Sequence, residues 1–582
     1  MTGDHNLSNL IWSIADILYN NIEAANYHKV ILPMTLIRRF DCVMTDTVKN
    51  GKTAKENLAM IVERFGSLRK GTPDERAKFE QLAFTATGLK FYNASGLDFQ
   101  ALASSSPQQV LANFRAYIDG FSDNVKDILE NFTFTGATPY LETLQKKGIL
   151  IGVTQKFAAL DLSPQALPNE DMGELYEALV RKWADTIKAD AGEFFTPRDI
   201  VHLLVDLLFA PDEAMLKGEG VIRTAYDPTA GTGGILTVAE SYAKQKNPKL
   251  RLNLYGQELK DISYAVCKAD MLIKHASTSE NADFQVELGN TLLEDKFLGR
   301  RFDYVTANPP YGAPWGGKNL KDHEQAIREQ TYRFPGGFPQ TGDSALLFVQ
   351  HIMNKMKTPA EGGGRAAIVL AGSPLFNGDA GSGESEIRRL LLERDLVDAI
   401  VALPTELFFD TGIGTFIWIL SNRKEGKRKG KVQLIDAREL AVKVRKPTGM
   451  KRYEISEELR AQIHEIYLDF EADTTYSKVF DTSFFGYRKV KVKIGKENDY
   501  ERMGLGEDIA EYLAREVLPF EPNAKVDTKF IDEKTNEVGR VGYEINFNRY
   551  FYVAKELEAS AEILKRIQAL EGEFVELMKG VA

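Results

Sequence analysis

The spacing of hydrophobic residues changes near residue 171. Before that point, apolar residues recur every three or four positions, as in LIWSIADILYNNI and PQQVLANFRAYIDGFSDNVKDILENF, which is the spacing of amphipathic helices. After it, short apolar runs ending in Gly, Pro, Asn or Asp alternate with helical segments. The pattern predicts a helical N-terminal domain over residues 1–170 and an α/β domain after it.

Six runs after residue 171 have the length and composition of strands: VIRTAYDP, LRLNLYGQE, DFQVELGN, RFDYVTANPP, GRAAIVLAG and LVDAIVALP. Helical segments such as GILTVAESYAKQ, DISYAVCKADMLIKH and DSALLFVQHIMNKM separate them. We predict a doubly wound, mainly parallel, Rossmann-like sheet over residues 171–480, and a mixed, mainly helical C-terminal segment over 481–582. Ligands of such folds bind beyond the carboxyl ends of the strands, so the strand-ending residues are the candidates for a site.

Composition adds only general limits. The chain has 582 residues, of which 43% are hydrophobic and 27% charged, as in ordinary soluble proteins of two or three domains. No apolar run approaches the ~18 residues needed to cross a bilayer, so we expect a cytoplasmic protein without a membrane partner. Cys42 and Cys267 are too few for a disulfide framework and are expected to be small buried residues. No Cys/His cluster has the spacing of a metal site.

Charge is unevenly distributed. The formal net charge of -10 argues against a surface that grips nucleic acid everywhere. Residues 421–452, however, contain twelve Lys and Arg against three Asp and Glu. Two interpretations stay open for this basic run: a solvated hairpin with a surface strand, or a patch that faces phosphates.

Three strand ends carry residues suited to an adenosine-containing ligand. The first strand runs into DPTAGTGGIL, where glycines let the backbone approach a ligand closely. The second ends in GQEL, which places an acid where it can accept both ribose hydroxyls. The third ends in LGN and offers an amide beside the adenine. The candidate residues are Asp227, Gly231, Thr232, Gly233, Gly234, Glu258 and Asn290.

The segment GEFFTPR precedes an amphipathic helix, DIVHLLVDLL. Its residues Phe194, Phe195, Thr196 and Pro197 could cap the amino-acid end of the same ligand. The two phenylalanines could equally belong to the core.

The fourth strand ends in NPPY, which fits chemistry on an exocyclic amine. An adenine N6 amine is a poor nucleophile because its lone pair is delocalised into the ring. The side-chain carbonyl of Asn308 and the backbone carbonyl of Pro309 can accept both N6 hydrogens, and Pro309 and Pro310 hold these acceptors in place because proline fixes φ. Tyr311 offers a ring for a flipped base to stack on. Phe408 or Phe409 could form the other wall of the pocket, or belong to the core.

Two other chemistries are excluded by the residues. GAPWGGK resembles a phosphate-binding loop, but Asn319 follows Lys318 where Ser or Thr is needed, Pro314 interrupts the loop, and the strand has already ended. A C5-cytosine methyltransferase needs a cysteine nucleophile beside the pocket. Neither cysteine stands at a strand end.

Taken in order, GEFFTPR, DPTAGTGG, GQEL, GNTL and NPPYG resemble the adenine-N6 DNA methyltransferases, and specifically the modification (methyltransferase) subunits of type I restriction-modification systems. The resemblance covers nearly the whole chain, including YEINFNRYFY and REVLPFEPNA in the tail. It implies S-adenosyl-L-methionine as cofactor, with Asn308 to Tyr311 as the catalytic loop. The implied cofactor site consists of Glu193, Phe194, Phe195, Thr196, Pro197, Arg198, Asp227, Gly231, Thr232, Gly233, Gly234, Glu258 and Asn290. Many relatives carry Asp where this chain has Asn290.

The resemblance also implies partners. Two modification subunits would share one specificity subunit that reads double-stranded DNA, and a motor-nuclease subunit would join for cleavage. The core here passes into a tail of only about 100 residues, which leaves no room for a target-recognition domain of its own. A partner is therefore expected to recognise the DNA sequence.

Two alternatives stay open. An NPPY transferase of this fold could methylate a protein glutamine or an RNA base instead of DNA. The chain could also be a non-enzymatic scaffold.

The last helix has a seam of apolar residues. Its members recur at spacings of 4, 3, 4 and 3 and are Ile563, Ile567, Leu570, Phe574 and Leu577. A helix of two heptads is too short to be stable alone, so the seam is expected to pack either on this chain's own core or on the specificity subunit.

Overall fold

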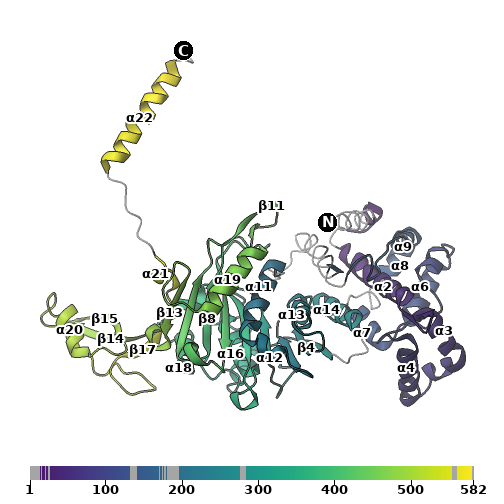
Figure 1. Ribbon diagram of the computed structural model, residues 1–582, viewed down its shortest axis with the longest axis horizontal. Coiled ribbons are helices and arrows are strands. Elements are labelled where there is room, and N and C mark those ends of the chain that lie inside the picture. The colour runs from purple at the N-terminus through teal and green to yellow at the C-terminus, as the bar shows by residue number, and fades with distance from the viewer. Residues whose placement is uncertain are drawn as a thin grey trace. The chain divides into compact units, whose positions relative to one another are not determined.

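The computed structural model describes residues 14, 16–19, 21–23, 26–131, 140–168, 171, 172, 175, 179, 196–275, 283–552 and 560–579. The chain divides into two compact units, Met1–Glu544 and Ile545–Ala582. Figure 1 shows the ribbon of the chain. None of the described helices is long and apolar enough to cross a membrane.

The first unit begins with helices, which confirms the predicted helical character of this part of the chain. Capping boxes start α3 and α4: Thr53 pairs with Glu56, and Thr72 with Glu75. One short hairpin, β1 Val48–Lys49 with β2 Lys52–Thr53, was not predicted. The helices are α2 His28–Asp46, α3 Ala54–Phe65, α4 Pro73–Thr87, α5 Phe99–Ala103, α6 Val110–Asp119, α7 Asp123–Asn131, α8 Tyr140–Lys146 and α9 Leu150–Ala158, with a 3-10 turn η2 at Gly66–Lys70.

A nine-stranded sheet follows, in the order β13-β10-β8-β9-β7-β6-β3-β4-β5. Strands β5, β4, β3, β6 and β7 are parallel neighbours, whereas β9 runs antiparallel between β7 and β8. All six predicted strands are confirmed; β9, β10 and β13 were not predicted. The strands are β3 Ile222–Asp227, β4 Arg251–Glu258, β5 Phe284–Leu288, β6 Tyr304–Ala307, β7 Arg365–Ala371, β8 Val397–Ala402, β9 Thr415–Ser421, β10 Lys431–Asp436 and β13 Ser477–Asp481.

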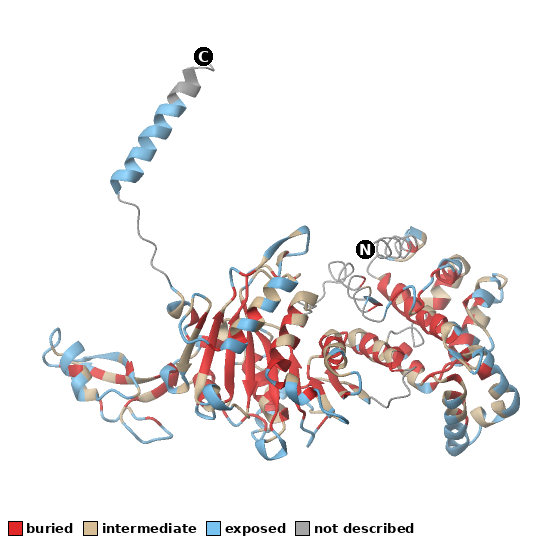
Figure 2. Cartoon of the chain, viewed as in Figure 1, coloured by how far each residue is buried: buried red, intermediate tan, exposed pale blue. Residues whose placement is uncertain are grey.

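Helices cover both faces of this sheet. Strands β6 and β8 are buried at every position, which explains why they are mainly hydrophobic and do not alternate, with Thr306 and Asp398 as their polar members. Figure 2 shows the buried residues gathered in the strands. The connecting helices are α11 Arg198–Phe209, α12 Glu213–Leu216, α13 Gly234–Lys246, α14 Asp261–Lys274, α15 Lys321–Arg328, α16 Ala345–Lys355, α17 Ser373–Phe376, α18 Gly383–Glu393 and α19 Glu457–Asp469, with 3-10 turns η3 Ala210–Asp212, η4 Pro359–Glu361, η5 Gly426–Arg428 and η6 Thr482–Phe485.

Helix α14 is buried on two sides. Its Cys267 and Met271 belong to the core of the sheet, while Ala265 and Ala269 belong to the core of the N-terminal helices. The Nζ atom of Lys268 also lies 2.6 Å from Asp127 of α7. The N-terminal helices therefore pack directly on the α/β fold.

The tail is mixed, as predicted, but it contains a long hairpin that was not identified from the sequence. This hairpin pairs β14 Gly486–Ile494 with β15 Glu497–Gly504, and β16 Lys525–Val526 and β17 Arg540–Tyr543 also pair with β14. The buried guanidinium of Arg388 in α18 donates to the carbonyl oxygens of Tyr543 and Asn377, at 2.6 and 2.8 Å, and so fixes β17 to the sheet domain.

The remaining elements are β11 Val442–Thr448, β12 Lys451–Glu454 and α20 Ile509–Glu516 and, in the second unit, α21 Phe547–Tyr550 and α22 Ser560–Lys579.

Candidate active site

The parallel pairing brings the candidate strand ends to one edge of the sheet. Asp227 of β3 pairs with Gly256 of β4, and Glu258 of β4 pairs with Leu288 of β5. Strand β6, which pairs with β3, leads directly into Asn308. Residues far apart in the sequence thus meet where ligands of α/β sheets bind.

The turn after β3 requires glycine at two positions. Gly231 and Gly233 have φ of 55° and 86°, in the left-handed region that glycine adopts without strain. A Cβ atom on Gly233 would lie 2.8 Å from the Sγ atom of Cys267, whereas the space beside Gly231 is open, with no atom within 4 Å. Cys267 is fully buried, as predicted, and it lies under this turn.

Glu258 holds the same turn. Its Oε2 atom accepts a hydrogen bond from the backbone N–H of Gly231 at 2.8 Å, and its Oε1 atom accepts one from Lys260 N–H at 2.8 Å. The carboxylate is nearly buried, with 9% of the residue's surface exposed. The acid at the end of β4 therefore fixes the glycine-rich turn of β3 in addition to any contact with a ligand.

Asp227 ends β3 and is buried. Its carboxylate accepts hydrogen bonds from the backbone N–H and hydroxyl of Thr229 at 2.8 and 3.2 Å, and from the Thr306 hydroxyl at 3.3 Å. Burial raises the pKa of this carboxyl to about 7, although these hydrogen bonds oppose the shift. Folding therefore favours the neutral form of Asp227 up to near-neutral pH.

This shift predicts a pH dependence of stability. Because the folded pKa lies above the unfolded one, the native state binds more protons between about pH 4 and pH 7, and the stability contributed by Asp227 is lost as pH rises through that range. We expect Asp227→Asn to gain stability relative to wild type over this range, by up to about 4 kcal/mol. Urea unfolding at several pH values measures this difference. Asp123→Asn, whose carboxylate is exposed, is the control; parallel curves for Asp227→Asn and wild type would contradict the prediction.

The NPPY residues form a hydrogen-bonded unit with the FTPR segment. The Nδ2 atom of Asn308 donates to the Thr196 hydroxyl at 2.8 Å, and the Tyr311 hydroxyl donates to the Oδ1 atom of Asn308 at 2.8 Å. The Asn308 amide is thus fixed on both sides. Thr196, predicted as a cofactor residue, also orients the predicted catalytic amide.

Tyr311 packs edge-on against Phe408. Their ring centroids lie 6.0 Å apart at an interplanar angle of 87°, and Phe408 is buried. Phe409 is half-exposed, and the ammonium of Lys451 lies 5.9 Å from its ring centroid. Burial raises the pKa of Tyr311, so its hydroxyl stays protonated and remains a donor. Phe408 is therefore the phenylalanine that touches the catalytic-loop candidate.

The other candidates differ in what the structure describes. The Oδ1 atom of Asn290 accepts hydrogen bonds from the backbone N–H groups of Leu292 and Leu293, so the residue caps a local turn. Pro197 is buried, and Arg198 begins α11. Glu193, Phe194 and Phe195 lie outside the described residues.

Asp199 and Lys451 were not identified from the sequence. The Nζ atom of Lys451 in β12 lies 2.9 Å from the Oδ1 atom of Asp199 in α11, and the Asp199 Oδ2 atom accepts from the backbone N–H of Ile455 at 2.9 Å. An acid in the first turn of a helix is common for reasons unrelated to a site, so its position gave no signal. The pair fixes the β11–β12 hairpin beside the segment that carries Thr196.

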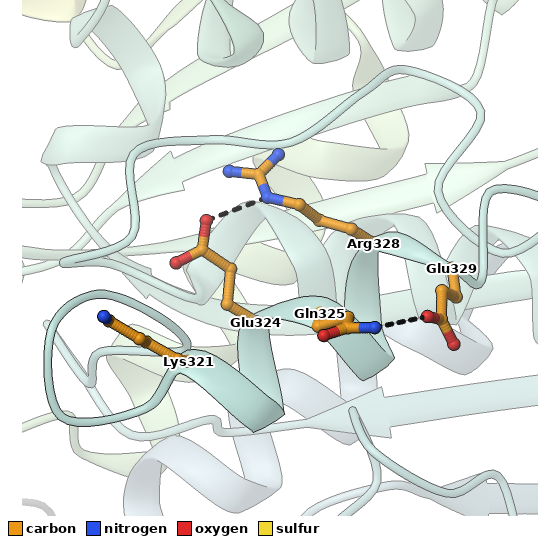
Figure 3. Close-up of a pocket in the computed structure, with 5 residues that line it drawn as sticks. All are labelled: Lys321, Glu324, Gln325, Arg328 and Glu329. Carbon is orange, nitrogen blue, oxygen red and sulfur yellow. Dashed lines mark hydrogen bonds and ion pairs between the residues drawn. The ribbon is translucent and has the colours of Figure 1, made fainter.

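A hollow of about 410 Å³ lies along α15 and is separate from these residues. Figure 3 shows that its lining comes from one helix, and that Arg328 pairs with Glu324 and Gln325 with Glu329. Glu324 also accepts from the backbone N–H of Gly317 at 2.8 Å. The GAPWGGK segment therefore directs this N–H at a carboxylate and not toward a phosphate.

Comparison with known proteins gives two family matches. Residues 168–498 match the N-6 DNA Methylase family, and residues 7–157 match the HsdM N-terminal domain. The chain is similar to the type I restriction enzyme MjaIX methylase subunit of Methanocaldococcus jannaschii, with 23% identity over 82% of this chain and 79% of that protein. It is also similar to the MjaVII methylase subunit of the same organism, with 27% identity over 64% of this chain and 60% of that protein.

Among solved structures, the chain resembles the type I restriction-modification methyltransferase subunit of Streptococcus thermophilus. The TM-score is 0.60 at 21% identity, covering 82% of this chain and 96% of that one. This likeness confirms the predicted fold.

Proposed function

Because the chain belongs to the N-6 DNA methylase family, it is an adenine-N6 DNA methyltransferase, and we propose that the NPPY residues and the glycine-rich turn form its active site. Its N-terminal match and its similarity to methylase subunits of type I restriction enzymes identify it as a modification subunit of such a system. The observation that carries the site proposal is the hydrogen-bonded chain from Thr196 through Asn308 to Tyr311 at the carboxyl end of β6.

A methyltransferase of this fold uses S-adenosyl-L-methionine, which supplies an electrophilic methyl group. The residues present fit this cofactor. The open space beside Gly231 leaves the turn accessible to a ligand, and Glu258 stands at the end of the adjacent strand, where an acid can accept ribose hydroxyls. We assign the adenosine to Asp227, Gly231, Thr232, Gly233, Gly234, Glu258 and Asn290, and the amino-acid end to Glu193, Phe194, Phe195, Thr196, Pro197 and Arg198.

Asn308 and Pro309 would prepare the target nitrogen. The Asn308 Oδ1 atom and the Pro309 carbonyl oxygen each accept one N6 hydrogen, which draws the nitrogen toward a tetrahedral geometry and directs its lone pair at the methyl group. Bound S-adenosyl-L-methionine would supply the methyl group to this nitrogen, its sulfur keeping the electrons of the broken bond, and the displaced N6 proton would pass to water. Tyr311 would stack on the flipped base, and Phe408 packs edge-on against its ring.

Glu258→Ala is expected to weaken cofactor binding by about 1 to 3 kcal/mol, or roughly 5- to 150-fold in Kd, because hydrogen bonds to a charged acceptor are lost and the turn loses its tie to β4. Calorimetric titration of the full chain with S-adenosyl-L-methionine measures this loss. Glu219→Ala removes an exposed carboxylate near the opposite ends of the strands and serves as control. An unchanged Kd for Glu258→Ala would show that the ribose lies elsewhere.

We further propose that the chain acts with partners. Type I specificity would come from a separate subunit that reads double-stranded DNA and carries two modification subunits, and a motor-nuclease subunit would join for cleavage. The apolar side chains of α22 support this proposal, since Ile563, Ile567, Leu570 and Phe574 are 40 to 64% exposed. The side chain of Leu577 lies outside the described residues.

Transfer of a labelled methyl group tests the function. The full chain, with and without its specificity subunit, is incubated with DNA free of N6-methyladenine, with RNA, and with a protein extract. We expect labelled N6-methyladenine in DNA only when the specificity subunit is present. Label in a protein glutamine or in RNA, with none in DNA, would instead support the alternative substrates.

A further inference from the structure

The β11–β12 hairpin is a narrow two-stranded ribbon. Its strands pair with each other and with no other strand of the described chain, and six of the seven residues of β11 are exposed. Figure 1 shows it projecting above α11, and Figure 2 shows how little of it is buried. Strand β12 joins the ribbon to the fold through the buried Lys451 and through Tyr453, which packs on the core, whereas the exposed β11 contributes little to a core and its sequence is free to serve another purpose.

The base of this hairpin is fixed to the loop that carries Phe408. The backbone N–H of Met450 donates to the Phe409 carbonyl oxygen at 2.6 Å, and that of Arg452 donates to the Glu406 carbonyl oxygen at 2.8 Å. The Lys451 ammonium adds a bond to the Leu407 carbonyl oxygen at 3.1 Å. Because Phe408 packs against Tyr311, these bonds place the hairpin beside the proposed base pocket.

The same strand is fixed to the other side of the proposed site. Lys451 pairs with Asp199, three residues after Thr196, whose hydroxyl accepts from Asn308. The hairpin is therefore anchored to both segments that flank Asn308. Its position relative to the reacting base is set by bonds that do not involve its outer residues.

The outer residues are cationic and unpaired. Residues 442–454 contain five Lys and Arg and one Glu. Lys451 forms an ion pair with Asp199, and the Arg452 guanidinium donates to the carbonyl oxygens of Gly449 and Lys451. Lys443, Arg445 and Lys446 are exposed, and none forms an ion pair with any residue that the structure describes.

The rest of the basic run contrasts with this cluster. Six of its cations are paired with carboxylates of the described chain: Arg423 with Asp212, Lys424 with Asp395, Arg428 with Asp398, Lys431 with Asp481, Arg438 with Asp436 and Lys451 with Asp199. Half of the twelve cations in residues 421–452 are thus structural. Lys427 and Lys429, beside η5, also lack a carboxylate partner among the described residues, but Lys443, Arg445 and Lys446 are the three that gather on a single strand.

We infer that Lys443, Arg445 and Lys446 bind backbone phosphates of the DNA strand next to the flipped adenine. The inference rests on the proposed function, since it takes the base pocket to lie at Asn308 and Tyr311. A chain with a net charge of -10 repels DNA over most of its surface, and three free cations beside the pocket offset that repulsion where the strand must be held. Phosphate contacts fix register without reading sequence, which suits a subunit that obtains its specificity from a partner.

The experiment measures the salt dependence of DNA binding. The assembly with the specificity subunit is prepared with the wild-type chain and with Lys443→Gln, Arg445→Gln and Lys446→Gln combined, and binding to a mixed-sequence duplex is titrated at increasing salt. The logarithm of the binding constant K falls with the logarithm of the salt concentration, and each phosphate contact adds about 0.9 to the steepness of that fall. We therefore expect the variant's slope to be shallower by about 2 to 3. Turnover at saturating DNA and cofactor affinity should stay at wild-type values.

A matched control carries the same charge change at the amino ends of the parallel strands, opposite the proposed site. Lys217, Lys249 and Arg251 are exposed and lie before the first residues of β3 and at the start of β4. Their combined replacement by Gln should leave the slope unchanged. An unchanged slope for the hairpin variant, or an equal change in both variants, would overturn the inference.

A second variant tests the placement of the charges. Gly449 has φ of 54°, and a Cβ atom there would lie 2.3 Å from the Phe409 carbonyl oxygen. Gly449→Ala keeps every cation but displaces the hairpin from its anchor, so the salt dependence of DNA binding should again become shallower. If either variant instead loses the specificity subunit with its salt slope intact, the hairpin is a protein-docking element and the inference is wrong. Absence of methyl transfer by the wild-type assembly would contradict the proposed function alone.

Discussion

Asn308→Ala is expected to abolish methyl transfer to adenine while S-adenosyl-L-methionine binds with near wild-type affinity. The substitution removes the Oδ1 acceptor that would hold one N6 hydrogen, and loss of one such group from a preorganised site costs at least about 100- to 1,000-fold in turnover. Cofactor affinity is expected to stay near wild type because Asn308 meets the cofactor candidates only through its hydrogen bond to Thr196, and none of its described hydrogen bonds reaches the glycine-rich turn or Glu258. Single-turnover methylation of DNA and calorimetry with the cofactor measure the two effects separately.

Tyr311→Phe is the matched control for this variant. It removes the hydroxyl that donates to Asn308 but keeps the ring against Phe408. If the ring serves in stacking and the hydroxyl only occupies Asn308 before the base arrives, turnover of Tyr311→Phe stays within a few-fold of wild type. Wild-type turnover in Asn308→Ala would remove the catalytic assignment.

Deletion of residues 555–582 is expected to leave a folded protein that still binds S-adenosyl-L-methionine but no longer assembles with the specificity subunit or methylates DNA. The second compact unit contains α22, and Leu564, Leu570 and Phe574 on this helix are 57 to 64% exposed. Burial of such side chains is worth roughly 1.5 to 3 kcal/mol each, so a partner that covers them gains much of its affinity there. Co-purification with the specificity subunit and DNA methylation assays test the deletion.

Point variants separate docking from a general effect of truncation. Leu570→Glu with Phe574→Glu should reproduce the loss of assembly, whereas Lys565→Glu with Glu573→Lys, which changes exposed charged residues and keeps the net charge, should not. A truncated chain that assembles and methylates normally, or one that fails to fold, would show that the helix does not dock on the partner.

The sequence predicted the strands of the sheet well where they are buried on both faces. Strands β6 and β8 are mainly apolar runs followed by Pro-containing segments, and such runs can be located without knowledge of their neighbours. The antiparallel β9 and the β14–β15 hairpin were missed, and the hairpin strands carry charged residues on surfaces that solvent covers. Strand β9, TFIWILS, is an apolar run buried at six of its seven positions, so it could have been located in the same way as β6 and β8. Strands β14 and β15 are neighbours in the chain, joined by Gly495 and Lys496, but their charged residues break up the apolar pattern that would have marked them.

For the site, the sequence located candidates but not their mutual contacts. The role of Glu258 in holding Gly231, and of Thr196 in holding Asn308, depends on which strand ends become neighbours. The need for glycine at position 233 likewise depends on Cys267, 34 positions along the chain in the next helix of the fold. These side-chain roles are properties of the assembled sheet edge. Their assignments to ligand atoms stay predictions.

The hydrogen bond from Tyr311 to Asn308 has a consequence for the rejection of wrong bases. A planar amine that enters the pocket replaces the Tyr311 hydroxyl as the donor to Asn308, so the Oδ1 acceptor stays satisfied. A thymine would present a carbonyl oxygen to the Asn308 Oδ1 atom and leave two acceptors facing each other without a proton. Each unsatisfied buried acceptor costs about 1 to 3 kcal/mol, so the acceptor at Asn308 penalises a misflipped thymine before any chemistry begins.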